Sequence, residues 1–129
     1  MDCLIIKQEP LNKILQGEKT WELRGTKTHK RGRIGLIQSG SGLIVGECEV
    51  VGCTTELSQT EFAQHKDKHC SKSTTKPYSK TYAWKIQNAK KYDDPIPYSH
   101  PKGAIIWVKV TLSERLCSKW FRRNCIFLH

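Results

Sequence analysis

The sequence predicts a mostly β, α+β fold in which five or six strands form a closed barrel with flanking helices. Several short segments alternate apolar and polar residues with the period of two that is typical of strands, whereas only two segments show helical patterns. Strands and helices do not alternate along the chain, which favours a mostly antiparallel, closed sheet over a parallel one. The 129 residues are also the usual length of a single domain.

The first expected elements are a strand at residues 3–7 and a short helix. Pro10 is tolerated in the first turn of a helix, and Gly17 suits the left-handed position that follows a helix end. The apolar residues between them recur at helical spacing and are expected to face the core: Leu11, Ile14 and Leu15.

A strand with a polar face is expected at residues 20–25. Side chains alternate between the two faces of a strand, so Trp21 and Leu23 share one face. The other face carries Thr20, Glu22 and Arg24.

Three further elements follow in the middle of the chain. Residues 33–38 and 43–51 are expected to form a hairpin around a Ser-Gly-Ser-Gly turn. Ser58 and Glu61 form a capping box, which predicts a helix over residues 59–69.

The last part of the domain is expected to contain, in order, a mobile basic loop at 70–80, a strand at 81–87, a stiff proline-rich connection at 93–103 and a largely buried strand at 104–112. We therefore place the domain at residues 1–112. Residues 113–129 are expected to form a basic, amphipathic C-terminal tail.

Cysteine and histidine spacing predicts neither a metal site nor a cofactor. The six cysteines show no CxxC pair, and His65 and His69 are interpreted as an exposed pair on a polar helix. An acidic residue follows Met1 in place of an apolar signal segment, and no stretch is long and apolar enough to span a membrane. These features favour a cytoplasmic protein with free thiols.

The charge balance predicts a polyanionic partner. Lysine and arginine number 22 against 12 acidic residues, which gives a formal net charge of +10. A strongly basic small domain favours RNA or a related nucleic acid as its partner.

Residues 14–25, ILQGEKTWELRG, are followed by a basic loop and RGRIGLIQSG, and this region resembles the ASCH domain. The signature of that family, approximately Gly-x-Lys-x-x-Glu-x-Arg, falls here on Gly17, Lys19, Glu22 and Arg24. The resemblance implies a barrel of the PUA-like type, whose members bind RNA, with a cleft lined by the signature residues. The resemblance also allows an enzyme, because some ASCH proteins are amidohydrolases that act on acetylcytidine and others are ribonucleases. The threonine of the amidohydrolase pattern is replaced here by Glu22.

The signature residues therefore have two candidate functional uses, besides the alternative of a structural ion pair that holds the helix cap to the strand. Glu22 and Arg24 can brace each other so that the guanidinium binds a phosphate beside the charge of Lys19. Alternatively, a desolvated Lys19 with Glu22 acts as the catalytic pair, with the lysine as general base. Aromatic and polar residues expected to complete the nucleic-acid site are Trp21, Ser39, Tyr82 and Trp84.

Three functions remain open from the sequence. The leading hypothesis is an RNA-binding or RNA-modifying module that recognises an unstacked or modified nucleotide in a cleft lined by Lys19, Glu22 and Arg24. The alternatives are a small hydrolase acting on modified nucleosides or RNA, and a protein-interaction module that binds a protein partner through the C-terminal tail.

Overall fold

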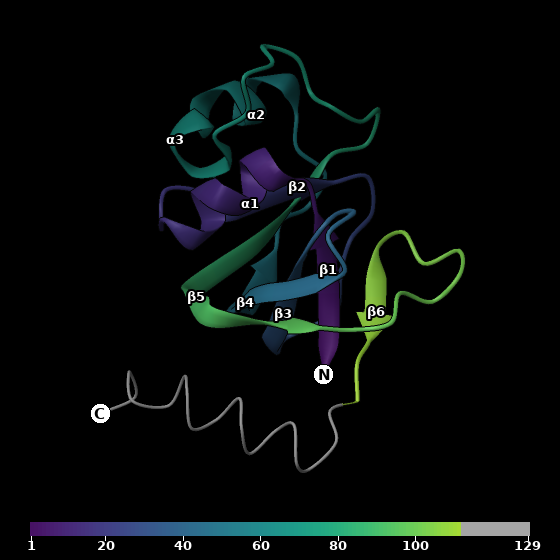
Figure 1. Cartoon of the computed structure of the whole chain (residues 1–129). Coiled ribbons are helices and arrows are strands. Elements are labelled where there is room, and N and C mark those ends of the chain that lie inside the picture. Colours follow the sequence, from purple (N-terminus) through teal and green to yellow (C-terminus); the bar gives the residue numbers. More distant parts are fainter. Residues whose placement is uncertain (112–129) are drawn as a thin grey trace.

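The computed structural model describes residues 1–111, and a single six-stranded sheet with the order β2-β5-β4-β3-β1-β6 forms its centre (Figure 1). β1 runs parallel to β3, and the other neighbouring strands are antiparallel. The strands are β1 (Asp2–Ile6), β2 (Trp21–Arg24), β3 (Gly32–Gln38), β4 (Leu43–Cys53), β5 (Tyr82–Pro97) and β6 (Trp107–Lys109). The helices are α1 (Gln8–Leu15), α2 (Gln59–Gln64) and α3 (Lys66–His69).

The sheet curls into a half-barrel and stays open. The predicted mostly β fold with flanking helices is confirmed, but the edge strands β2 and β6 do not pair with each other among the described residues, so the expected closed barrel is not formed. These two strands are only four and three residues long. Neither therefore offers the row of backbone groups that closure of a sheet requires.

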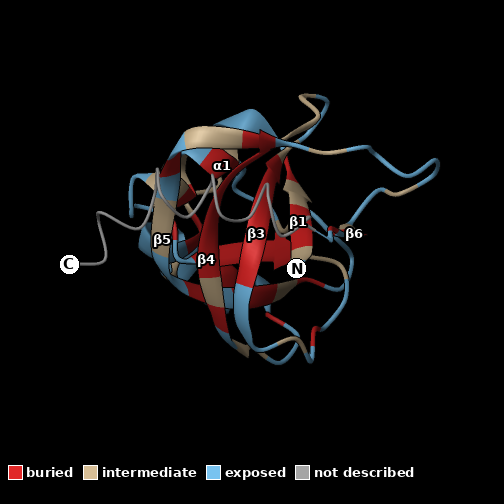
Figure 2. Ribbon diagram, turned by 60° about the horizontal axis from the view of Figure 1, so that its bottom comes forward, coloured by how far each residue is buried: buried red, intermediate tan, exposed pale blue. Residues whose placement is uncertain are grey.

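Helix α1 covers one end of the curled sheet (Figure 2). Leu11 and Ile14 are fully buried there and pack against apolar side chains of β1 and β3, including Leu4 and Ile34. Gly17 follows with a φ of +82°, a conformation that glycine adopts without steric cost, and it turns the chain into β2. The predicted helix and its glycine end are thus both present.

Strand β5 is much longer than the predicted strand at 81–87. It continues to Pro97, into the first part of the expected proline-rich connection, after a bend at Asn88, where φ is +52°. β2 pairs only with the first residues of β5, and within residues 1–111 the only strand paired with the later part of β5 is β4. Proline is tolerated at such an edge because its missing N–H faces no partner strand.

Two other predicted elements are corrected. The expected helix at 59–69 is split at His65, whose backbone leaves helical geometry between α2 and α3. The expected buried strand at 104–112 is reduced to β6, and Ile105 before it is 79% exposed. Leu112 and the predicted tail at 113–129 lie outside the described residues.

The cysteines of the described region are all free thiols: Cys3, Cys48, Cys53 and Cys70. Within residues 1–111, every helix is too short or too polar to cross a bilayer.

Candidate functional site

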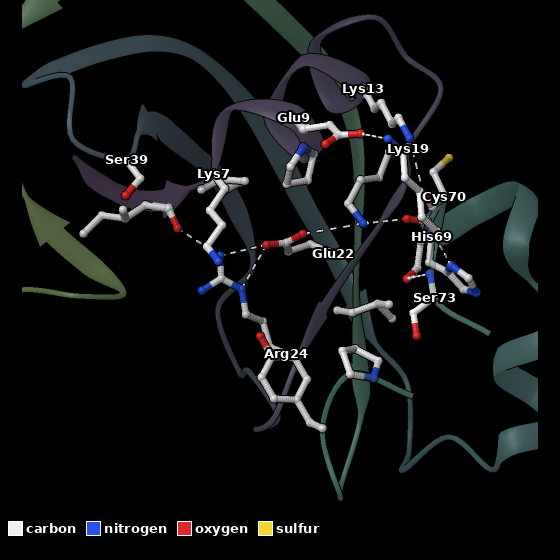
Figure 3. A pocket seen from close by; sticks show the side chains of 18 of the residues that line it. Lys7, Glu9, Lys13, Lys19, Glu22, Arg24, Ser39, His69, Cys70 and Ser73 are labelled. Atoms are coloured by element: carbon white, nitrogen blue, oxygen red, sulfur yellow. Dashed lines mark hydrogen bonds and ion pairs between the residues drawn. The ribbon is translucent and has the colours of Figure 1, made fainter. Parts of the chain in front are cut away.

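A cavity of about 550 Å³ opens where the end of β1, the start of α1, strand β2 and the loop after α3 meet (Figure 3). Its lining is rich in charge, and cations outnumber anions. The charged lining residues are Lys7, Glu9, Lys13, Lys19, Glu22, Arg24 and Lys72.

Strand β2 supplies the floor of this cavity. Trp21 and Leu23 pack with Leu57 and Phe62 in a small apolar cluster. Because side chains alternate along a strand, Glu22 and Arg24 are turned to the opposite face, where the cavity lies. The predicted polar face of this strand is therefore the face that meets the cavity.

Two nitrogens of Arg24 donate to the same carboxylate oxygen of Glu22. Oε2 of Glu22 accepts hydrogen bonds from Nε of Arg24 at 2.9 Å and from Nη2 at 2.7 Å. Nη2 also donates to the carbonyl oxygen of Ile5 at 2.9 Å. Nη1 has no hydrogen-bond partner among the described residues, so two N–H donors remain available at the cavity.

The other carboxylate oxygen of Glu22 is in an ion pair with Lys19. Oε1 lies 3.6 Å from Nζ of Lys19, a longer contact than those to Arg24, and the residue is only 6% exposed. Figure 3 shows the carboxylate between the two cations. The buried carboxylate is thus balanced by a cation on each side.

Lys19 is held by two backbone carbonyls. Its Nζ donates to the oxygens of Trp21 and His69, each at 2.7 Å. Burial lowers the pKa of Lys19, while the Glu22 carboxylate opposes that shift. The ammonium therefore ties β2 to the end of α3, and two of its three hydrogens are committed to that contact.

His69 lies in the cavity wall beside Lys19, and its imidazole ring is held in one tautomer. Its Nδ1 accepts a hydrogen bond from the backbone N–H of Ser71 at 2.9 Å, so Nε2 carries the proton and donates to the Phe62 carbonyl at 2.7 Å. The ring is buried and stacks on Phe62 with centroids 4.3 Å apart. Burial lowers the pKa of His69, which favours the neutral ring. His69 is thus not one of an exposed histidine pair.

The sequence profile of the ASCH domain matches residues 4–96, which include β1 to β5 and the Lys19, Glu22 and Arg24 cluster. The chain belongs to the ASCH domain family. ASCH domains are generally RNA-associated modules. No curated protein shows a sequence match to the chain.

Solved structures of the ASCH protein of Zymomonas mobilis share the fold of this ASCH domain. A serine-to-alanine variant superposes with a TM-score of 0.67 and another structure of the same protein with 0.63. Each is 13% identical to this chain and covers 95% of both chains. A tyrosine-to-phenylalanine variant of that protein superposes with a TM-score of 0.59. At this identity the likeness establishes the fold alone.

The ASCH domain brings four of the predicted site residues to one cavity, namely Lys19, Glu22, Arg24 and Ser39. It does not bring the three predicted aromatic residues there. Trp84 is 2% exposed and stacks on Trp107, and Trp21 stacks on His65. Tyr82 lies beside Lys27, also outside the cavity lining. The side chains expected to stack on a base are thus enclosed or face elsewhere.

Several lining residues were missed from the sequence. Lys7 precedes α1, Lys13 lies in its last turn and His69 ends α3. None of them belongs to the family signature. Tyr78 stands in the loop at residues 70–80 and is 44% exposed at the cavity. An aromatic residue in an otherwise polar loop was the available signal for this position.

Proposed function

We propose that this ASCH domain binds RNA by taking one unstacked or modified nucleotide into the cavity. The observation that carries the proposal is the pair of groups that β2 presents at the cavity: the Oε1 acceptor of Glu22, whose contact with Lys19 is 3.6 Å long, and the two donors at Nη1 of Arg24. Each base presents adjacent donors and acceptors on its edge, and these complement such a pair. A ligand of this kind would add a hydrogen bond to the carboxylate oxygen that Arg24 does not contact.

The rest of the cavity suits the sugar and phosphate of the same nucleotide. Lys7 and Lys13 lie along the lining and offer cations for phosphate groups, whereas Lys72 is in an ion pair with Glu9. A volume of about 550 Å³ falls in the usual range of ligand pockets. The formal charge of +10 favours an extended polyanion over an isolated nucleoside.

The geometry at Lys19 favours binding over hydrolysis. A general base must present a free nitrogen lone pair to the proton that it removes. The Nζ of Lys19 instead donates to two carbonyls and faces the Glu22 carboxylate. Deprotonation of Lys19 would weaken these hydrogen bonds and remove the ion pair with Glu22. The lysine is therefore better suited to stabilise the site than to act as a base on a substrate.

A titration with single-stranded RNA at several salt concentrations tests this function. Binding should weaken as salt rises, with a slope of about −0.7 for each phosphate neutralised. Lys7→Ala should weaken binding and make the slope shallower by about that amount. Lys102→Ala is the matched control, because Lys102 is exposed but does not line the cavity. Weak, salt-insensitive binding that Lys7→Ala leaves unchanged would contradict the proposal.

A further inference from the structure

Resting on the nucleotide-binding function proposed above, we infer that Tyr78 is the platform on which the base of the bound nucleotide stacks. The occupant is then an unpaired nucleotide, because a base inside a duplex has no free face to offer. This assignment replaces Tyr82 and Trp84 as stacking residues.

Tyr78 is distinguished by where its ring lies. Of the phenylalanine, tryptophan and tyrosine side chains in residues 1–111, it alone lines the cavity. It is also 44% exposed, whereas Trp84 is 2% and Trp21 is 7% exposed. Its hydroxyl has no hydrogen-bond partner among the described residues. A large aromatic surface at the cavity is therefore left without a partner in the folded domain.

The ring is supported from behind by the strand that carries the site. A Cβ atom added to Gly25 would lie 3.2 Å from Cδ1 of Tyr78 and 3.4 Å from its Cγ, so the ring rests against the glycine backbone. Gly25 directly follows Arg24 at the end of β2. A base stacked on this ring would thus lie close to the free donors of Arg24.

The backbone of Tyr78 is also fixed. Oγ1 of Thr81 donates to the carbonyl oxygen of Tyr78 at 2.7 Å and accepts from its N–H at 3.3 Å. Thr81 is fully buried, and Pro77 restricts the backbone just before the tyrosine. A ring held in this way loses little freedom when a base stacks on it, which favours binding.

The test uses the full chain and a short single-stranded RNA with one internal 2-aminopurine, whose fluorescence falls when it stacks on an aromatic ring. Tyr78→Leu keeps an apolar side chain but removes the π face. It is expected to abolish the fall in emission and to weaken binding by roughly 5- to 150-fold. Tyr78→Phe should retain both the emission change and the affinity.

Val51→Ala serves as the control for loss of an exposed apolar side chain, since Val51 is 46% exposed and lies outside the cavity lining. It should bind RNA like the unmodified protein. Thermal unfolding of each variant verifies that the fold is kept. Free 2-aminopurine riboside monophosphate, tested in parallel, should show the same dependence on Tyr78 at higher concentration, because it offers only one phosphate.

The outcomes separate the two proposals. RNA that binds in a salt-dependent manner, with equal affinity for Tyr78→Leu and no change in emission, would overturn the stacking role and leave RNA binding intact. Failure of every RNA to bind would overturn RNA binding instead. A free nucleotide that binds as tightly as RNA in a Tyr78-dependent manner would support stacking and assign the cavity to a small ligand.

Discussion

Glu22 is a buried carboxylate placed between two cations, and its environment decides how this part of β2 is stabilised. Its side chain is 8% exposed, and those of Lys19 and Arg24 are 5% and 16% exposed. Charges that leave water lose their hydration, so such a cluster is stable only while opposite charges and hydrogen bonds compensate one another. Removing the one anion would leave two buried cations without their counter-charge.

Glu22→Gln is therefore expected to lower the free energy of unfolding by about 3–5 kcal/mol. Chemical denaturation measures this change. Glu49→Gln is the matched control, because Glu49 also faces an arginine, at 3.9 Å, but its side chain is 32% exposed. We expect that substitution to cost less than about 1 kcal/mol. Equal losses for the two variants would show that burial does not set the energetics of Glu22.

For individual residues, the sequence predicted the positions of the charged side chains better than those of the aromatic ones. Alternation along residues 20–25 was sufficient to place Glu22 and Arg24 on one face, because the period of a strand is a local property. Whether Trp84 is enclosed depends on Trp107, which is distant in sequence and stacks on it. No local pattern carries that information, so the expected stacking residues were assigned to the wrong surroundings.

The segment from α2 to the loop after α3 forms one wall of the cavity, and His69 secures it. The imidazole ring of His69 stacks on Phe62 of α2, and its Nδ1 accepts a hydrogen bond from the N–H of Ser71. The backbone carbonyl of His69 accepts a hydrogen bond from Lys19. Protonation of Nδ1 would remove the acceptor for Ser71 and place a charge in a buried site. This wall is consequently sensitive to acid.

Stability should fall as the pH drops below about 6.5, the ordinary pKa of histidine. The pKa of His69 is lowered by burial, so in that range the unfolded chain binds a proton that the folded protein does not. Denaturation curves at a series of pH values measure the effect. His69→Gln should be less stable but should lose this part of the pH dependence.

His29→Gln provides the control for that experiment, because His29 is exposed and lies outside the cavity. It should keep the pH dependence of the unmodified protein. A His69→Gln variant that still lost stability between pH 6.5 and lower values, to the same extent, would contradict the role given to His69.

Elements with strong local signals were predicted well, and those defined by neighbours were not. The hairpin of β3 and β4 and the capping box at Ser58 have signals within a few residues, and both are present. The extension of β5 to Pro97 depends on its pairing with β4, where Leu43 lies opposite Pro97. The reduction of the last strand to β6 reflects its place at the sheet edge beside β1.

For the molecule as a whole, the mostly β class was predictable because many segments contribute to it independently. Closure of the sheet could not be predicted in the same way, since it depends on whether β2 and β6 pair with each other. The open half-barrel leaves α1 and the loop after α3 to surround the cavity in place of further strands. The site is therefore built largely from segments that connect strands.

The position of β1 between β3 and β6 has a consequence for how the chain folds during synthesis. Asp2 pairs with Lys109, so the first strand described shares a ladder with the last strand described. Until residues 107–109 emerge, one edge of β1 offers unpaired backbone groups beside the buried side chains of Cys3 and Leu4. Such distant pairing slows folding and lengthens the time during which nascent chains can aggregate.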